Sequence, residues 1–352
     1  MLMDLARPRV VFWMGITMFI ELLNEKGVLL ADGATGTNFF NNGLEAGYPP
    51  ELWNDEQPEK VLNLHRGFLE AGSDLILTNT FGGTCHRLKL HHAQDRVVEL
   101  NKKGALLARQ AAEEFGRKIV IAGSVGPTGE LLVPLGELTY EGAIEAFTEQ
   151  IEGLKQGGVD VIWIETMSAT EEIKAASEAA KASGLPYVFT CSFDTAGKTM
   201  MGLDPSAVNT ITCDSGDRPH AHGANCGVGA SDLLVSVLSM TKADPDAIIV
   251  AKANCGVPEI RGENVVYNGT PELMAEYARL AVDAGARVVG GCCGTTADHI
   301  AAMRQALDGH VARTRPTTED IITAIGPLNA PPAANDRGAE GGRRERKRRR
   351  AS

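Results

Sequence analysis

The chain has 352 residues, a hydrophobic fraction of 43% and a formal net charge of −11. Residues 337–352 hold eight Arg or Lys and two Glu, so the rest of the chain carries −17, and a body this acidic is a poor partner for nucleic acid. Seven cysteines in a chain of this length do not resemble a secreted disulfide framework, and they indicate metal ligands or free thiols of a cytoplasmic protein.

Residues 1–17 contain a short apolar run, 10–16, that Arg7 and Arg9 precede. The run is too short for a membrane span, Glu21 interrupts its continuation, and no small-residue cleavage site follows as in a signal peptide. We therefore interpret residues 1–17 as an unstructured extension or a start that is assigned too early, with Met18 as the true first residue. No association with a membrane is expected.

From residue 28 onward, short β-branched runs alternate with longer amphipathic stretches. The runs predict eight strands, over residues 28–33, 75–81, 119–126, 160–167, 187–193, 221–227, 247–255 and 287–293. Helical patterns lie over residues 58–71, 96–115, 140–157, 169–183, 230–241 and 271–284, whereas residues 200–219 show little helical periodicity. This alternation predicts an α/β fold, a (β/α)8 barrel of the TIM type over residues 18–312, with its active site at the C-terminal ends of the strands.

The pattern changes after Asp308. Within residues 313–328 we expect one short helix, over 317–325, because Thr318 and Glu319 suit its start and Gly326 would end it. Residues 329–352 are rich in Pro, Ala, Gly and then Arg, from which no core can be built, so we interpret them as a disordered basic tail. Contact with RNA or a membrane surface is the alternative for this tail.

The last predicted strand ends in Gly290-Gly291-Cys292-Cys293-Gly294. Neighbouring side chains on a regular strand point to opposite faces, but flanking glycines let the backbone curl, so that both thiols can face one point. Cys226 ends a strand two places away in the barrel and could supply the third thiolate of a zinc site with one open position. The alternative is a pair of buried free cysteines, and Cys255 is a fourth thiol to consider.

These cysteine motifs, with Asp32-Gly33, the segment 78–81, the segment 123–127 and Glu165-Thr166, resemble the homocysteine S-methyltransferase family from about residue 28 to 307. The resemblance implies one zinc ion held by Cys226, Cys292 and Cys293. It also implies that Asp32 and Glu165 hold the amino group of L-homocysteine, with Gly33 and Thr80 as further substrate contacts. Taken alone, either acid could instead cap a helix or bind an Arg.

The activity that the resemblance implies is zinc-dependent transfer of a methyl group to the thiol of L-homocysteine, giving methionine. Betaine or a similar small onium compound is the favoured donor, and Trp53, Phe39, Phe40 and Phe81 offer aromatic faces for it. The alternative donor is a methyl-corrinoid protein, which would make the chain the homocysteine-activating subunit of a split cobalamin-dependent methionine synthase.

Two other classes of protein compete with this interpretation. A non-catalytic zinc barrel could serve as a scaffold. Barrel chemistry on a phosphate substrate would use a lysine base, but Lys252 stands two residues before Asn254 on the same face and is expected to lie deeper in the barrel. The sequence leaves the oligomeric state open.

Overall fold

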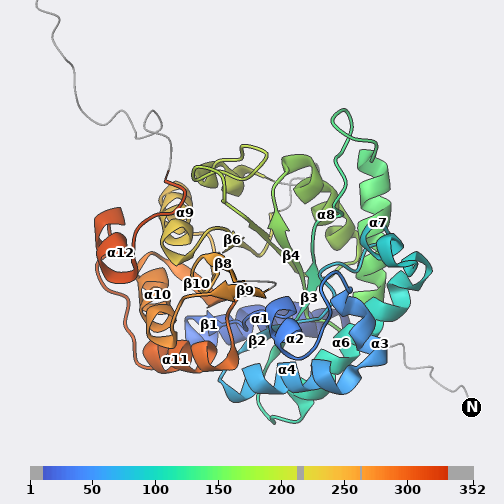
Figure 1. The fold of residues 1–352 in the computed structure, drawn as a ribbon, viewed down its shortest axis with the longest axis horizontal. Helices are drawn as coiled ribbons and strands as arrows, with labels where there is room; N and C mark the ends of the chain where they lie inside the picture. Colours follow the sequence, from blue (N-terminus) through green and yellow to red (C-terminus); the bar gives the residue numbers. More distant parts are fainter. Residues whose placement is uncertain (1–10, 212–217, 262–263, 332–352) are drawn as a thin grey trace, which may run out of the picture.

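The computed structural model describes residues 11–211, 218–261 and 264–331. Eight parallel strands form one sheet in the order β1-β10-β7-β6-β5-β4-β3-β2 (Figure 1). A parallel bridge between Ala31 and Leu75 joins the two edge strands, so the sheet closes on itself. The predicted (β/α)8 barrel of the TIM type is confirmed.

The barrel strands all fall within or beside the predicted runs: β1 (Leu29–Leu30), β2 (Leu75–Leu77), β3 (Val120–Val125), β4 (Val161–Met167), β5 (Tyr187–Cys191), β6 (Ala221–Cys226), β7 (Ile249–Ala253) and β10 (Ala286–Gly291). The long helices between them are α4 (Pro58–Glu70), α6 (Val97–Glu113), α7 (Tyr140–Gln156), α8 (Thr170–Ala182), α9 (Ala230–Ala243), α10 (Pro271–Asp283) and α11 (Ala297–Leu307). Shorter helices lie in the loops: α2 (Gly36–Asn41), η1 (Pro50–Leu52), α3 (Trp53–Glu56), α5 (Cys85–Leu88), η2 (Lys89–His91), η3 (Gln94–Arg96) and η4 (Pro205–Thr210).

Several predicted strands are longer than the observed ones, because their polar C-terminal residues leave the sheet. After Leu77, the amide of Thr80 donates to the carbonyl of Thr78, which turns the backbone away from β geometry. A short antiparallel hairpin that the sequence did not predict, β8 (Pro258–Arg261) with β9 (Asn264–Tyr267), follows β7. Residues 212–217 of the weakly patterned segment 200–219 lie outside the described residues.

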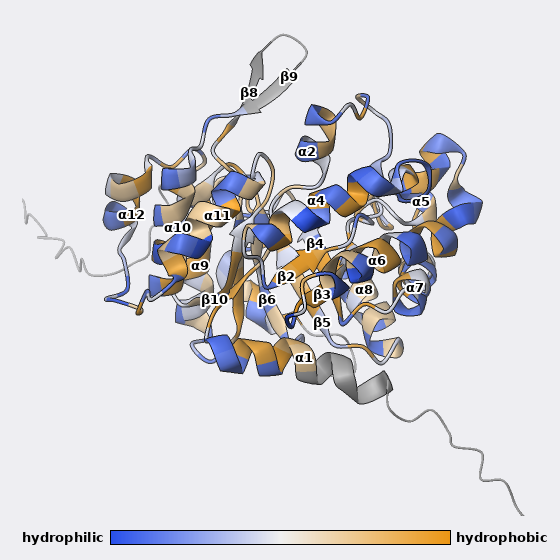
Figure 2. Ribbon diagram, turned by 90° about the horizontal axis from the view of Figure 1, so that it is seen from below, coloured by the Kyte–Doolittle hydropathy of each residue, from blue (hydrophilic) through white to orange (hydrophobic). Residues whose placement is uncertain are grey.

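Alternate side chains of the strands fill the interior of the barrel. Helix α1 (Val11–Lys26) lies across one end of the barrel (Figure 2). Phe19, Leu22 and Leu23 are fully buried in the same cluster as the inward-facing Trp163. Helix α1 begins at Val11, before the start at Met18 that we expected, so residues 11–17 are helical rather than unstructured.

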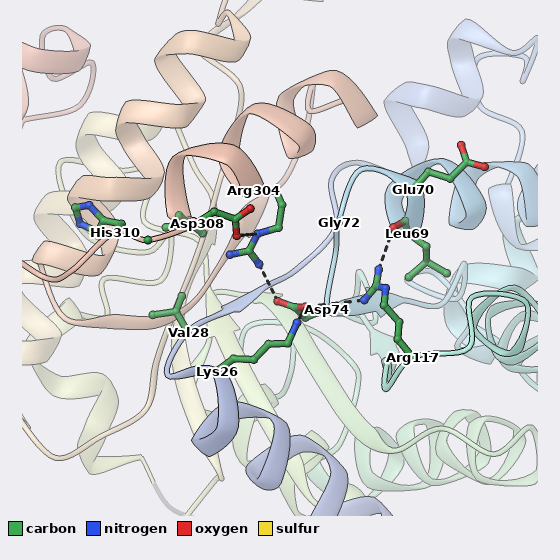
Figure 3. Close-up of a pocket in the computed structure, with 12 residues that line it drawn as sticks. Lys26, Val28, Leu69, Glu70, Gly72, Asp74, Arg117, Arg304, Asp308 and His310 are labelled. Atoms are coloured by element: carbon green, nitrogen blue, oxygen red, sulfur yellow. Dashed lines mark hydrogen bonds and ion pairs between the residues drawn. The ribbon is translucent and has the colours of Figure 1, made fainter.

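The N-terminal ends of the strands are held by ion pairs around one buried carboxylate, Asp74 (Figure 3). Lys26 Nζ lies 2.5 Å from one Asp74 oxygen, and an Arg304 nitrogen lies 3.2 Å from the other. Arg117 donates to the carbonyls of Leu69 and Ser73. A cavity of about 610 Å³ opens here, but its three cations already have partners, so we assign the cluster a structural role.

Beyond the barrel, Thr317 caps helix α12 (Thr318–Ile325), which matches the helix expected over residues 317–325. The amides of Asn329 and Ala330 donate to the Asp232 carboxylate on α9 at 2.9 Å each, so the first two residues of the expected disordered tail are hydrogen-bonded to the barrel. Residues 332–352 lie outside the described residues. None of the helices within the described ranges combines the length and the apolar character that a bilayer crossing requires.

Candidate metal centre

Three cysteine side chains meet above the C-terminal ends of β6 and β10. Cys226 is the last residue of β6, and Cys292 and Cys293 directly follow β10. The three sulfur atoms lie within 4.8 Å of one another, and those of Cys226 and Cys293 are 4.0 Å apart. Tetrahedral zinc with Zn–S bonds of about 2.3 Å needs sulfur atoms roughly 3.8 Å apart, so the cluster fits a zinc ion that three thiolates hold.

The backbone around the cysteines departs from strand geometry at specific positions. Cys226 has a φ of 60°, a left-handed conformation that is unusual for a residue with a side chain, and it turns the sulfur away from the course of β6. Gly291 is required because a Cβ there would lie 2.2 Å from the Thr295 side chain. Gly294 has a φ of 79° and lies under the ring of Tyr267. The expected curl of a glycine-flanked cysteine pair is therefore present.

Two asparagines hold the cysteine cluster in place. The Asn225 side chain donates to Thr166 Oγ1 at 2.7 Å and accepts from the Thr190 hydroxyl at 2.7 Å, which leaves its amide 3.9 Å from Cys292 Sγ. Asn254 accepts from the Cys293 amide at 3.0 Å. Hydrogen bonds of this kind orient metal ligands in proteins. Neither asparagine was singled out from the sequence, although each stands directly before a cysteine.

The remaining neighbours are Tyr267 and Cys255. The Tyr267 side chain hydrogen-bonds to Cys293, and the hairpin that carries it was not predicted. Cys255 is 1% exposed, and its sulfur lies 3.1 Å from the Gly269 carbonyl and 3.0 Å from His299 Nε2. Within the described residues Cys255 is therefore not part of the cysteine cluster.

The pKa values of the three clustered cysteine thiols are all raised. The hydrogen bond with Cys226 raises the pKa of the Cys292 thiol well above its usual range, and burial adds to this rise against an opposing contribution from Cys293. Three neighbouring thiolates would repel one another strongly in this buried place without a cation. A divalent metal ion is the natural counter-charge for such a cluster.

Asp32 forms a buried ion pair that was not expected from the sequence, and its expected contact with the substrate amine stays a prediction. The Lys252 ammonium lies 2.6 Å from Asp32 Oδ1, and Oδ2 accepts the amide of Leu77 at 2.7 Å. Both side chains of the ion pair are 2% exposed. Lys252 was expected deep in the barrel, and its ion pair with Asp32 was missed because the two residues stand 220 positions apart.

Glu165 is also buried, but its partner is neutral. Its Oε1 accepts the Ser124 hydroxyl at 2.5 Å. Burial raises the pKa of Glu165, and the charge of Lys252 and the Ser124 hydrogen bond oppose that rise. Thr80 donates to the Ser124 carbonyl at 2.7 Å, and a Cβ at Gly33 would lie 2.7 Å from the Thr295 carbonyl. Contact of Gly33, Thr80 or Glu165 with substrate stays a prediction.

Two of the four aromatic residues considered for an onium donor lie in the core. Phe39 and Trp53 are buried with ring centroids 5.0 Å apart, and the Lys60 ammonium lies 4.4 Å from the Trp53 ring. Phe40 and Phe81 are exposed. An aromatic cage that uses Trp53 and Phe39 is therefore not formed.

The model of the homocysteine S-methyltransferase family matches residues 29–307. The chain belongs to this family. It is 30% identical to the methionine synthases of Mycobacterium leprae, over 337 residues, and Mycobacterium tuberculosis, over 332 residues. Each alignment covers 88% of this chain but only 27% of the relative, so the chain spans about a quarter of the length of these methionine synthases.

Solved structures of the same fold include the homocysteine methyltransferase MmuM from Escherichia coli. Its oxidised form matches with a TM-score of 0.69 and 24% identity, and its metallated form with a TM-score of 0.68 and 24% identity. Each match covers 82% of this chain and 99% of MmuM. At this identity the likeness establishes the barrel fold alone.

Proposed function

We propose that the protein transfers a methyl group to the thiol of L-homocysteine, giving methionine, and that it does so with one zinc ion held by Cys226, Cys292 and Cys293. The observation that carries the proposal is the convergence of three thiols from two strands at distances that suit tetrahedral zinc. Membership of the family supports the acceptor.

The bound ion would lower the pKa of a fourth thiol at its open position, so that homocysteine reacts as a thiolate at neutral pH. The protein's own residues orient the reactants. Asn225 and Asn254 hold the cysteines through the hydrogen bonds described above. Glu165 provides a carboxylate for the α-ammonium group, beside the buried Asp32–Lys252 pair. The sulfur of homocysteine would then form a bond to the methyl carbon in a single displacement, while the bond between that carbon and the donor atom breaks and the demethylated donor leaves with the electron pair.

Betaine remains the first donor to test, because the sequence favours a small onium compound. A methyl-corrinoid protein is the second candidate, and two observations favour it. Trp53 and Phe39 are unavailable for a cage. Large apolar side chains are exposed in the segments that follow β2, β3 and β5, at the same end of the barrel as the cysteines, and they offer a surface for a protein-bound donor: Phe81, Leu131, Val133, Leu135, Met200 and Met201.

The test is an assay of the purified, zinc-loaded protein with L-homocysteine and each donor in turn, with methionine measured as the product. Methionine from betaine supports the first donor, and methionine only from methylcobalamin, free or protein-bound, supports the second. Cys292→Ala is the control and should yield no methionine with either. Zinc binding without methionine from any donor would instead favour a non-catalytic scaffold.

A further inference from the structure

The loop that follows the candidate zinc ligand Cys226 has an unusual backbone. Cys226 has a φ of 60°, Gly227 a φ of 75° and Gly229 a φ of 140°, and helix α9 begins at the next residue. A residue with a side chain keeps a left-handed conformation only where its surroundings hold it there. The position of the Cys226 sulfur therefore depends on the contacts of this loop.

Two asparagine side chains hold the loop through its carbonyl oxygens. Asn254 Nδ2 donates to the Gly227 carbonyl at 2.6 Å, and Asn329 Nδ2 donates to the Val228 carbonyl at 3.0 Å. Asn254 also accepts the Cys293 amide, so it belongs to the cysteine site itself. Asn329 instead comes from the C-terminal part of the chain, 101 positions after Val228.

Residues 326–330, here called the C-terminal clamp, are fixed on the first turn of α9. The amides of Asn329 and Ala330 donate to the buried Asp232 carboxylate at 2.9 Å each. A Cβ at Gly229 would lie only 3.1 Å from Asn329 Nδ2, so glycine at this position leaves room for the asparagine side chain. The backbone of the clamp thus places the Asn329 side chain at the loop.

Helix α12 anchors the clamp to the barrel. Ile321 and Ile325 are buried in the main core cluster, and α12 lies beside α9 (Figure 1). Directly after the helix, the Gly326 carbonyl accepts the Ser231 hydroxyl at 2.8 Å. The family model ends at residue 307, so α12 and the clamp both lie outside the region that it matches.

We infer that the C-terminal clamp holds the loop after Cys226 in the conformation that a bound metal ion requires, with Asn329 as a positioning residue for this zinc ligand. The bond from Asn329 to the Val228 carbonyl keeps the peptide groups next to Cys226 in place before the metal binds. Metal affinity then depends on a segment outside the family domain. The inference rests on the proposed function, because it treats Cys226 as a zinc ligand.

Asn329→Ala isolates this contact, because the backbone amides of residues 329 and 330 can still donate to Asp232. The dissociation constant for zinc, measured by competition with a chromophoric chelator, should rise about three- to tenfold, the factor that one hydrogen bond contributes. The visible absorption of the Co²⁺-loaded variant should also differ from that of the wild-type protein, because it reports the geometry of the thiolate ligands. The thermal melt should change little, because Asn329 is exposed.

Thr317→Ala is the matched control. It removes the side-chain cap of α12 but leaves the hydrogen bonds of Asn329 and Asp232 in place. Its thermal melt should fall, as for the loss of a helix cap, whereas its zinc affinity should stay within about twofold of the wild-type value.

A second variant, Asp232→Ala, releases both backbone amides of the clamp. It should weaken zinc binding at least as much as Asn329→Ala does. Adding Asn329→Ala to it should change the zinc affinity little further, because contacts within one network do not contribute additively.

The outcomes are distinct. Equal zinc affinity and equal Co²⁺ absorption in the wild-type protein and Asn329→Ala would overturn the inference. A loss of zinc affinity in Thr317→Ala as large as that in Asn329→Ala would overturn it as well, since the affinity would then follow overall stability. Full additivity of Asp232→Ala and Asn329→Ala would remove the clamp from the argument. A wild-type protein that binds neither metal would refute the proposed function, and the inference with it.

Discussion

The sulfur atoms of Cys226 and Cys293 lie 4.0 Å apart, although Cys226 ends β6, Cys293 follows β10, and the two residues stand 67 positions apart in the chain. Parallel strands bring their C-terminal ends to one edge, and the left-handed turn at Cys226 aims its sulfur toward β10. We expect Cys292→Ser to lose most of the bound zinc and all activity, because two thiolates do not complete the site. Metal analysis of the purified variant measures this.

The matched control for the cysteine variants is Cys85→Ser, because Cys85 is half-buried and not part of the cysteine cluster. It should keep about one zinc per chain. Cys191 is a poorer control, since it is fully buried and serine would place a hydroxyl in the core. Cys213, which we also expect to be dispensable, lies outside the described residues. Full zinc content in Cys292→Ser would refute the ligand assignment.

Asn225 supports the cysteines without being a ligand itself. Asn225→Ala removes its hydrogen bonds to Thr166 and Thr190 and frees the Cys292 side chain. Loss of such a partner typically lowers metal affinity by about 10- to 100-fold. Competition with a chelator measures the change, and Asn63→Ala, at an exposed position of α4, is the control. An unchanged zinc affinity would mean that the cysteines are held by the backbone alone.

Asp74 should be important for stability and not for activity. Asp74→Asn would leave Lys26, Arg117 and Arg304 close together without their central counter-charge. We expect the free energy of unfolding to fall by about 2–4 kcal/mol, as for breaking a buried ion pair. Urea denaturation measures the loss. Glu114→Gln breaks the exposed pair with Arg66 and should leave the free energy of unfolding nearly unchanged.

His65 should make the protein less stable in acid. Burial lowers the pKa of His65 to about 4, so between pH 6.5 and 4 the unfolded chain binds a proton at His65 that the folded chain does not. Stability is therefore lost as the pH falls through this window, by at most about 3 kcal/mol. In His65→Leu the free energy of unfolding should change less steeply with pH in this window, by the slope that one bound proton contributes. Substitution of the exposed His91 by Leu is the control and should leave that slope unchanged. An unchanged slope in His65→Leu would contradict the assignment.

The ends of the chain can be shortened, but not at every boundary. A chain of residues 18–331 keeps Phe19, Leu22 and Leu23 in the barrel and Asn329 on Asp232, so its thermal melt and activity should match the full chain. Ending the chain after Leu328, as the sequence suggested, removes two amide donors to Asp232 and should cost about 1–3 kcal/mol. A lower melt of residues 18–331 would give the removed segments a structural role.

Much of this protein could be predicted from its sequence, because the relevant physics is local. The alternation of apolar runs and amphipathic stretches follows from side-chain periodicity. The eight apolar runs predicted the eight strands of the barrel. The polar strand ends marked the edge of the barrel that carries the site. The adjacent cysteines between glycines indicated the curl of the backbone, because glycine allows conformations that other residues rarely adopt.

The tertiary structure alone decided how the charges pair. Asp32 follows β1 and Glu165 lies within β4, yet only Asp32 forms an ion pair with Lys252 among the described residues. The register places Lys252 opposite Gly290, which leaves space for the Lys252 side chain. Tyr267 reaches Cys293 from a hairpin too short to have a recognisable pattern. Trp53 was considered as an aromatic face for the donor, but it is buried against Phe39. These contacts join residues far apart in the chain. The local periodicity of a sequence predicts helices and strands, but it does not predict which distant residues come into contact.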